Sequence, residues 1–455
     1  MVRMCCVRCL AAAILLLLAL PALAQSPVPS PYDSVDPFIG TGGEGNVFPG
    51  ATLPFGMIQW SPDTGTDGWY RAGKDRIYGF SLTHLSGAGC PMYGDFPVLP
   101  WPGELTVSPH ADRALYTAPF SHSKEEAHPG YYAVTLENGT KVEITVSERA
   151  GIARFTFPQG VPARLLLNAG GSANSGIIDR EPKNVARSND GFAIRIVGKD
   201  AVEGEARSGA FCNSPTRYTV YLAAQFDQPF TRTAMWHDDA VDASAHDENA
   251  RHAGAWLDFG DVHEVTMKAG VSFVSVDGAW GNLRPTTSGD DDFESIRHSA
   301  RMKWLRMLDL FRVEGGSPEQ RKIFYTGVYH MLLSPNLFGD GEYVGFDGER
   351  HKILPYNGTC NGPHCWSTQY ANFSDWDTYR NVIQMHTLLD PDLGSDEAQS
   401  LVNDAQQSGW LPRWPAANDV TYVMGGDSPT ILLADAYAFG ARHFDAHAAL
   451  QYMLK

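Results

Sequence analysis

A glycine-rich stretch near the N-terminus is the first segment whose residues could take part in chemistry. Residues 35–57 hold six Gly and three Pro, and Gly40, Thr41, Gly42 and Gly43 form its densest part. Glycine lets backbone N–H and C=O groups come close to a ligand, so the composition predicts a loop of fixed shape. A phosphate-binding loop is excluded because no Gly-Lys-Ser/Thr sequence follows. A purely structural loop is the alternative.

The second segment, residues 79–95, gathers imidazole, hydroxyl and carboxyl groups among glycines. His84, Tyr93 and Asp95 are its candidates for hydrogen bonds to the hydroxyl groups of a sugar. A nucleophilic Ser–His–Asp arrangement, as in an unrelated secreted hydrolase, has little support because the segment lacks a G-x-S-x-G elbow. A histidine that makes only structural hydrogen bonds is the other interpretation.

Aromatic and charged residues come together twice more in the second half of the chain. The sequence SDWDTYR provides Trp376, which could stack on a pyranose ring, and Asp377 and Arg380, which could bind its hydroxyls. The sequence GWLPRWP adds Trp414. The alternatives are a carboxylate that caps a helix start and a tryptophan that packs between helices.

Length and charge limit the classes of function. The chain has 455 residues, too many for one ordinary domain, and its 43% hydrophobic residues suffice for a large core. The formal net charge of −17 gives no general attraction to nucleic acid or to an anionic membrane. The aromatic content of 11% suits sugar-binding clefts, although aromatic-rich cores would explain it equally.

The N-terminus predicts a secretory signal. Arg3 and Arg8 precede an apolar run from Leu10 to Leu20, and Ala22-Leu23-Ala24 is a cleavage site. The apolar run is too short to span a membrane comfortably, so we expect no stable membrane anchor. Cleavage after Ala24 predicts a periplasmic or secreted protein.

Four cysteines follow the predicted cleavage site: Cys90, Cys212, Cys360 and Cys365. An oxidising compartment permits disulfides, and the turn-forming residues between Cys360 and Cys365 favour a local bridge between them. A zinc site with His364 is the alternative, but zinc needs four ligands and no second cysteine pair of suitable spacing is present.

Short strands dominate the chain from about residue 35 to residue 280. Runs 131–136 and 141–146 alternate apolar and polar residues around Asn138-Gly139, which is typical of a hairpin. Further strands, with no helix between them, are expected at residues 153–157, 163–167, 192–197, 218–226, 263–268 and 271–276. The pattern predicts an antiparallel β-sandwich.

Helices dominate the rest of the chain. Apolar residues of 293–311 lie on one helical face, and Ser317, Pro318 and Gln320 are the start signals of a helix that ends before Pro335. Further helices are expected at residues 377–389, 395–408, 428–440 and from 444 onward. Strands followed by helices predict a multidomain, β-then-α protein.

Taken together, the four segments resemble glycoside hydrolase family 92, the secreted exo-acting α-mannosidases. The matching pieces are VDPFIGTGGEGNVFPGATLPFGM, GFSLTHLSGAGC, SDWDTYR, and GWLPRWP with the later MGGDSP and ADAY. The resemblance implies an antiparallel β-sandwich joined by linker helices to an (α/α) six-hairpin barrel, with the active site between them. The implied divisions are a signal peptide 1–24, a leader linker 25–34, a sandwich 35–280, a linker helix region 281–316 and a partial barrel 317–455.

The resemblance also implies a reaction, the calcium-dependent, inverting hydrolysis of α-mannosides in mannose-containing glycans. Asp377 matches a family residue that binds mannose, and the loop from Gly40 to Gly43 matches the sandwich edge of the same pocket. His84, Tyr93 and Asp95 match a neighbouring loop, with Tyr93 on the leaving-group side. Calcium would bind mannose hydroxyls and help to distort the ring.

An inverting glycosidase needs two carboxyl groups, a general acid and a general base. By the resemblance, the acid Glu and the base Asp are expected beyond Lys455, together with most calcium ligands and about half of the barrel helices. We therefore expect a member of an α-mannosidase family with an incomplete barrel and negligible catalysis, which a further C-terminal chain could complete. The alternative is a non-catalytic carbohydrate-binding or assembly protein.

Overall fold

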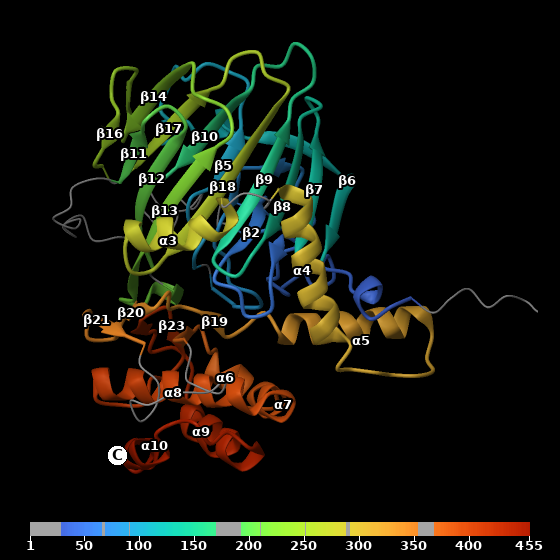
Figure 1. The fold of residues 1–455 in the computed structure, drawn as a ribbon, viewed down its shortest axis with the longest axis vertical. Helices are drawn as coiled ribbons and strands as arrows, with labels where there is room; N and C mark the ends of the chain where they lie inside the picture. The colour runs from blue at the N-terminus through green and yellow to red at the C-terminus, as the bar shows by residue number, and fades with distance from the viewer. Residues whose placement is uncertain are drawn as a thin grey trace, which may run out of the picture.

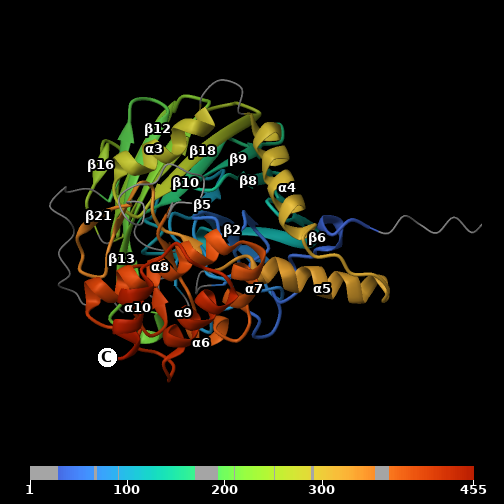
Figure 2. The same ribbon diagram turned by 60° about the horizontal axis from the view of Figure 1, so that its bottom comes forward.

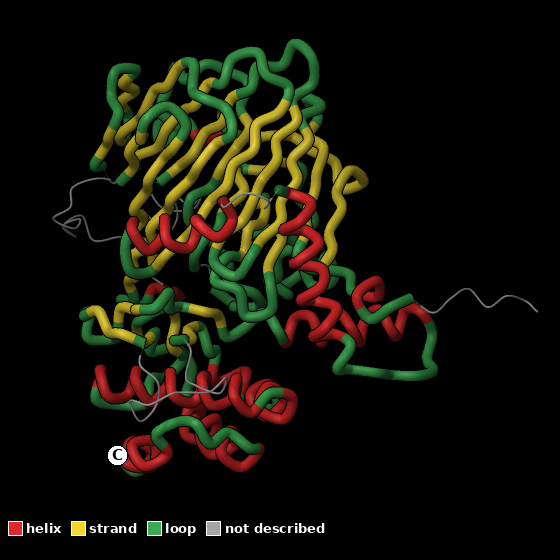
Figure 3. Tube along the Cα trace, in the orientation of Figure 1, coloured by secondary structure: helices red, strands yellow, loops and turns green. Residues whose placement is uncertain are grey.

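Most strands lie toward one end of the molecule and most helices toward the other, which confirms the predicted β-then-α order (Figure 3). The computed structural model describes residues 29–65, 69–90, 92–169, 193–209, 211–250, 252–287, 292–353 and 368–455. The predicted signal peptide, 1–24, and the predicted Cys360–Cys365 bridge lie outside the described residues.

Two antiparallel sheets face each other in the strand-rich end (Figure 1). In order across the sheet, the eight-stranded one consists of β1 (Ala51–Thr52), β2 (Gln59–Asp63), β4 (Gly79–Ser81), β5 (Val98–Pro100), β10 (Arg164–Asn168), β17 (Ala253–Asp258), β14 (Arg232–His237) and β15 (Ala240–Asp242). The ten-stranded one consists of β16 (Asp247–Glu248), β11 (Ile194–Val197), β12 (Ala201–Gly209), β13 (Arg217–Phe226), β18 (Glu264–Ser272), β9 (Ala150–Thr156), β8 (Lys141–Val146), β7 (Tyr131–Leu136), β6 (Ala118–His128) and β3 (Arg76–Ile77).

Large aromatic side chains fill the space between the sheets. Trp60 of β2 is fully buried, and its indole N–H donates to the Phe80 carbonyl at 3.0 Å. The opposite sheet makes room for it with Gly151 of β9, where a Cβ would lie 2.8 Å from the Trp60 ring. A glycine in this strand is therefore a packing residue, and the sheets interlock around it.

The predicted hairpin is confirmed: β7 and β8 pair around Asn138-Gly139, and Gly139 has a φ of +86°. The prediction of two strands at 263–268 and 271–276 was wrong, because β18 runs unbroken through Gly270 and residues 276–287 form helix α3. A Cβ on Gly270 would lie 2.4 Å from the Ala279 carbonyl oxygen. The glycine that resembled a turn signal is there because α3 packs directly on the strand.

Two helices lie on the outer face of the ten-stranded sheet (Figure 1). Helix α3 (Val276–Thr287) covers β13 and β18, and α4 (Phe293–Leu308) covers β8 and β9. The buried Trp304 of α4 also contacts β1 of the other sheet, because its indole N–H donates to the Thr52 carbonyl at 2.7 Å. Helix α5 (Pro318–Met331) follows with the predicted capping box of Ser317 and Gln320.

The remaining helices gather at the other end of the molecule (Figure 2). They are α6 (Asp375–Thr378), α7 (Val382–Leu389), α8 (Pro391–Ser408), α9 (Ser428–Phe439) and α10 (Ala446–Met453). The predicted helix 377–389 is split into α6 and α7, and the Gln384 side chain donates to the Tyr379 carbonyl at 2.6 Å near the break. Helix α8 starts earlier than predicted because Asp390 caps it and Pro391 occupies its first turn.

Three two-stranded hairpins or ribbons lie between the sandwich and the helices. They pair β19 (Asn336–Leu337) with β22 (Tyr370–Ala371), β20 (Glu342–Val344) with β21 (Arg350–Lys352), and β23 (Pro415–Ala416) with β24 (Asp419–Val420). Among the described residues, no helix has the length and apolar character needed to cross a membrane.

Candidate functional site

Two stacked rings join the sandwich to the helical end. Phe211, in the short helix η3 (Phe211–Asn213), lies almost parallel to Trp414, with ring centroids 4.3 Å apart. Cys212 forms a disulfide with Cys90, which fixes the position of Phe211 relative to the loop that carries Tyr93. The sequence analysis missed this bridge because its cysteines lie 122 residues apart. The predicted bridge between Cys360 and Cys365 remains a prediction.

Tyr93 is a second link across this boundary. Its hydroxyl donates to Asn372 Oδ1 at 2.9 Å, and the Ala417 N–H donates to the same oxygen at 2.9 Å. Burial raises the pKa of Tyr93, so the phenol stays neutral and acts as a donor. The sandwich loop, Asn372 before α6 and the β23–β24 turn therefore meet at one oxygen atom.

Asp95 is fully buried and lies near enough to Tyr93 to affect it electrostatically. Its carboxylate accepts hydrogen bonds from the hydroxyls of Thr83 at 2.8 Å, Tyr218 at 2.7 Å and Ser208. Burial raises the pKa of Asp95, and the three hydroxyls oppose that shift by stabilising the charged form. The side chain was predicted to contact a sugar, but its oxygens already accept bonds inside the sandwich.

His84 is buried in the same part of the sandwich. Its Nδ1 lies 2.8 Å from the Gln59 carbonyl oxygen and its Nε2 lies 2.8 Å from Asp63 Oδ1. Both ring nitrogens thus face acceptors, and burial raises the pKa of the Asp63 carboxyl. The geometry matches the structural interpretation of this histidine, while its contact with a sugar stays a prediction.

The glycine-rich loop has one fixed position and one open edge. Gly40 has a φ of +92°, and a Cβ there would lie 3.0 Å from Val47 Cγ2. Cβ atoms added to Gly42 or Gly43 would meet nothing within 4 Å. Thr41 is buried and donates from its hydroxyl to the Phe38 carbonyl at 2.8 Å. Only Gly42 and Gly43 therefore lie along open space.

The predicted sugar-binding residues of SDWDTYR do come together, at helix α6. Trp376 is 37% exposed, and the Arg380 guanidinium lies 4.8 Å from its ring centroid. Burial raises the pKa of Asp377, and Trp414 and Arg380 oppose the shift. These four side chains, Trp376, Asp377, Arg380 and Trp414, form what we call the α6 cluster.

The sequence analysis missed one member of this site, the buried Asp375. Its Oδ1 accepts a hydrogen bond from the Trp414 backbone N–H at 2.7 Å, while its Oδ2 has no partner among the described residues. Burial raises the pKa of Asp375 to about 6. The alternative interpretation placed Asp375 or Asp377 as the cap of the helix, but Ser374 occupies the N-cap position, with no side-chain cap bond.

Chemically, the α6 cluster offers a partly exposed indole ring, a carboxylate and a guanidinium. This combination suits a sugar ring, because the ring's C–H face packs on an aromatic plane while its hydroxyls bond to charged groups. The described residues contain no group of three His, Cys, Asp or Glu side chains that could hold a metal ion.

The chain has a strand-rich first part and a helical second part, and each part matches a known family model. The model of the glycosyl hydrolase family 92 N-terminal domain matches residues 34–272, and that of the family's catalytic domain matches residues 278–455. The chain belongs to glycosyl hydrolase family 92.

Solved structures of this family have the same fold. A family GH92 α-mannosidase from Bacteroides thetaiotaomicron is 29% identical with a TM-score of 0.81, over 94% of this chain and 57% of that one. A complex of the same enzyme with mannoimidazole aligns with 30% identity and a TM-score of 0.81, over 94% of this chain and 55% of that one. A family GH92 inverting mannosidase from the same organism is 29% identical with a TM-score of 0.77, over 95% of this chain and 56% of that one.

A curated relative is also described as a glycosidase. An uncharacterized secreted glycosidase of Arthroderma benhamiae is 24% identical over 430 residues, which cover 89% of this chain and 49% of the relative. The chain thus spans about half the length of this relative.

Proposed function

We propose that this chain serves the exo-acting, inverting hydrolysis of α-mannosides and binds a terminal mannose at the α6 cluster. Family membership and the similarity to α-mannosidases, one of them in complex with mannoimidazole, support the substrate class. The observation that carries the proposal is the meeting of Trp376, Asp377 and Arg380 beside Trp414, at the boundary between the two parts of the molecule.

In this proposal Trp376 stacks on the mannose ring, and Asp377 and Arg380 bind its hydroxyls. Gly42 and Gly43 form the sandwich edge of the pocket through their backbone groups, because open space adjoins them. Tyr93 positions Asn372, and His84 and Asp95 hold the loop from within.

We assign no acid or base role to the described carboxyl groups. Inversion requires two carboxyls about 6.5–9.5 Å apart, with room for a water between them. Asp375 instead holds the Trp414 backbone, and Asp377 lies against Trp414 and Arg380. The placement of the general acid and base beyond Lys455 stays a prediction.

Three further parts of the proposal come from the family. Helices α7, α8, α9 and α10, of which α7 packs on both α8 and α9, would belong to an (α/α) barrel. Export, with cleavage after Ala24, is supported by a curated relative described as secreted. Calcium dependence is carried over from the family without assigned ligands.

Titration of the full chain with mannose, followed by tryptophan fluorescence and calorimetry, tests the binding site. We expect Trp376→Ala and Asp377→Asn each to weaken binding by about tenfold or more, since each loses a stacking or charge-assisted contact. Trp410→Ala is the matched control because this tryptophan is 60% exposed and lies outside the α6 cluster. Equal binding by all three variants and the wild type would disprove the site.

Hydrolysis of 4-nitrophenyl α-mannoside with calcium present tests the reaction. Binding with no release of nitrophenol would agree with carboxylates placed beyond Lys455. Turnover that depends on Asp377 would contradict that placement and would exclude the non-catalytic alternative.

A further inference from the structure

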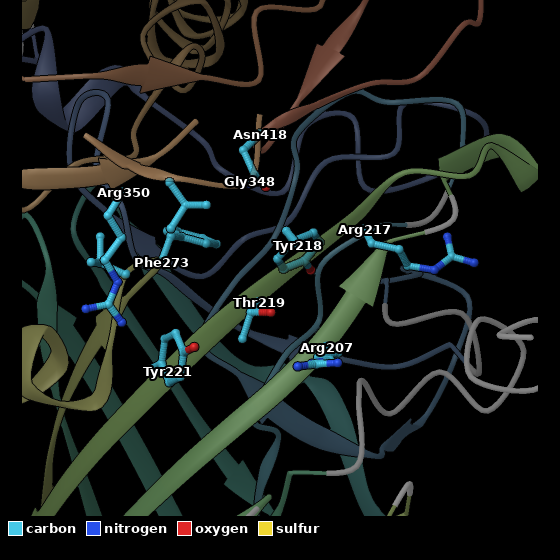
Figure 4. A pocket seen from close by; sticks show the side chains of 11 residues that line it. Arg207, Arg217, Tyr218, Thr219, Tyr221, Phe273, Gly348, Arg350 and Asn418 are labelled. Atoms are coloured by element: carbon cyan, nitrogen blue, oxygen red, sulfur yellow. The ribbon is translucent and has the colours of Figure 1, made fainter. Parts of the chain in front are cut away.

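A pocket of about 330 Å³ lies where the ten-stranded sheet meets the β20–β21 hairpin (Figure 4). Strands β12 and β13 form one wall, and the hairpin with the β23–β24 turn forms the other. None of its lining residues belongs to the α6 cluster or to the other residues predicted to bind sugar. Its volume is within the range of small-molecule sites.

The charge of this pocket is opposite to that of the protein. Arg207, Arg217 and Arg350 line it, and its lining contains no Asp or Glu. The whole chain carries a formal net charge of −17. Glu205 pairs with Arg207 and Asp419 lies near Arg217, so part of this charge is compensated. Arg350 has no ion pair in the described part of the chain, and the hollow keeps a positive charge that favours a negatively charged ligand.

Two of the arginines already have partners on the sandwich side. Arg207 lies 3.4 Å from Glu205, and Arg217 donates to the carbonyl of the preceding residue, Thr216, at 2.5 Å. Arg207 is also paired with Thr219 across the two strands, so both side chains face the pocket from one side of the sheet. Such fixed guanidinium groups lose little conformational freedom when a ligand binds.

The third arginine comes from the other wall. Arg350 is exposed on β21, and it makes no ion pair within the described part of the chain. Figure 4 shows Arg350 and Tyr221 at one end of the pocket and Arg207 and Arg217 at the other. Between them, Thr219 and Asn418 offer a hydroxyl and an amide. The pocket thus presents charged donors at its ends and neutral hydrogen-bonding groups in its middle.

We propose that this pocket binds a small anion whose charged group is a phosphate or a carboxylate. A guanidinium presents paired N–H donors that match the oxygens of either group. The neutral groups between the arginines would bond to the remainder of a ligand of about monosaccharide size. This site is independent of mannose binding at the α6 cluster.

Calorimetric titration of the full chain tests the proposal, with ionic strength held constant by sodium chloride. The probes are inorganic phosphate, a hexose 6-phosphate, glucuronate and uncharged mannose. We expect the three anions to bind, and Arg350→Gln to weaken them by about tenfold, because one charge-assisted contact is lost. Arg350→Lys keeps the positive charge but lacks the paired N–H donors of a guanidinium, so it should retain part of the affinity.

Arg306→Gln is the matched control because Arg306 is exposed on α4, outside the pocket. Circular dichroism melts establish that the variants are folded. Tighter binding of hexose 6-phosphate than of inorganic phosphate would identify a sugar-borne anion, whereas equal binding would identify the free anion. The proposal is overturned if no anion binds or if Arg350→Gln binds as tightly as the wild type. Mannose binding, unaffected by Arg350, reports separately on the α6 cluster.

Discussion

The sandwich and the helical end each bury an aspartate close to the boundary between them, and the two carboxyl groups differ in their hydrogen-bond partners. Asp95 of the sandwich accepts bonds from three hydroxyls, those of Thr83, Ser208 and Tyr218. Asp375 of the helical end accepts a bond from the Trp414 N–H at Oδ1, and its Oδ2 has no partner in the described structure. Burial raises the pKa of both carboxyls.

The difference shows which part of the boundary is built for stability. A buried carboxylate with several donors is a structural element, since removing it leaves its partners unpaired. A buried carboxyl with a bare oxygen costs stability, and proteins keep such groups mainly at functional sites. The sandwich side of the boundary therefore has a fully bonded buried carboxylate, and the helical side has a buried carboxyl with one unpaired oxygen.

The largest expected effect comes from Asp95→Ala. The substitution leaves three hydroxyl donors unpaired in the core, so we expect a loss of about 4 kcal/mol in the free energy of unfolding. Urea denaturation measures it. Asp95→Asn keeps one acceptor oxygen and should lose less. A loss below about 1 kcal/mol for Asp95→Ala would show that the hydroxyl network does not hold the loop.

The Cys90–Cys212 bridge gives the sandwich side its second constraint. Replacing both cysteines by serine should lower the free energy of unfolding by about 3 kcal/mol, because the bridge closes a loop with a sequence separation of 122 residues. Chemical denaturation without reductant checks this. The comparison variant replaces Cys360 and Cys365, for which the predicted bridge, with its shorter loop, implies a smaller loss. A larger loss in this variant would contradict the dependence on loop length.

Asp375 should make the helical end pH-dependent. Its pKa rises from 3.8 to about 6 on folding, so the folded protein keeps a proton that the unfolded chain releases. Stability due to this group therefore falls as pH rises from about 4 to 6, by at most about 3 kcal/mol. Asp375→Asn cannot titrate, and we expect it to be more stable than the wild type at pH 7 by about 2 kcal/mol.

Unfolding curves of the variant and the wild type at several pH values test this directly. Burial lowers the pKa of His330 from 6.5 to about 4. The stability that this residue contributes to the folded protein is therefore lost as pH falls from 6.5 to about 4. The variant and the wild type both contain His330, so its effect cancels when their free energies of unfolding are subtracted. The pH dependence of that difference is due to Asp375. A variant less stable than the wild type at pH 7 would mean that the charged carboxylate stabilises the site.

The smallest effect is expected at the open edge of the glycine loop. Gly42→Ala should change the free energy of unfolding by no more than about 0.5 kcal/mol, because the added methyl group enters empty space. Gly40→Ala is the contrasting variant: its φ of +92° and its contact with Val47 predict a loss of about 1–2 kcal/mol. Thermal melts compare them, and equal midpoints would remove the distinction between the fixed and open positions.

Local patterns in the sequence predicted local structure well. The Asn138-Gly139 hairpin, the capping box at Ser317 and the β-then-α order all depend on residues close together in the chain, and the structure confirms them. The α6 cluster was found for a similar reason, because three of its four members lie within SDWDTYR.

Long-range partners left no such pattern. The contacts of Tyr93 with Asn372 and of Asp375 with Trp414 join residues 279 and 39 positions apart, so each residue type alone gave no sign of its partner. Gly270 misled for the opposite reason, since a glycine required by helix packing has the same appearance in a sequence as a turn.

The stack of Phe211 on Trp414 has a consequence for protein engineering. A chimera that replaces the sandwich with that of a family member removes one ring of the pair and the Tyr93 donor to Asn372 at the same time. The transplanted unit must therefore carry the segment from Asn372 to Val420 with it, or carry rings of matching shape. A recombination point in the linker after α4 would leave the sandwich and the helical part each intact. It would nevertheless place Phe211 and Trp414 on segments from different parents.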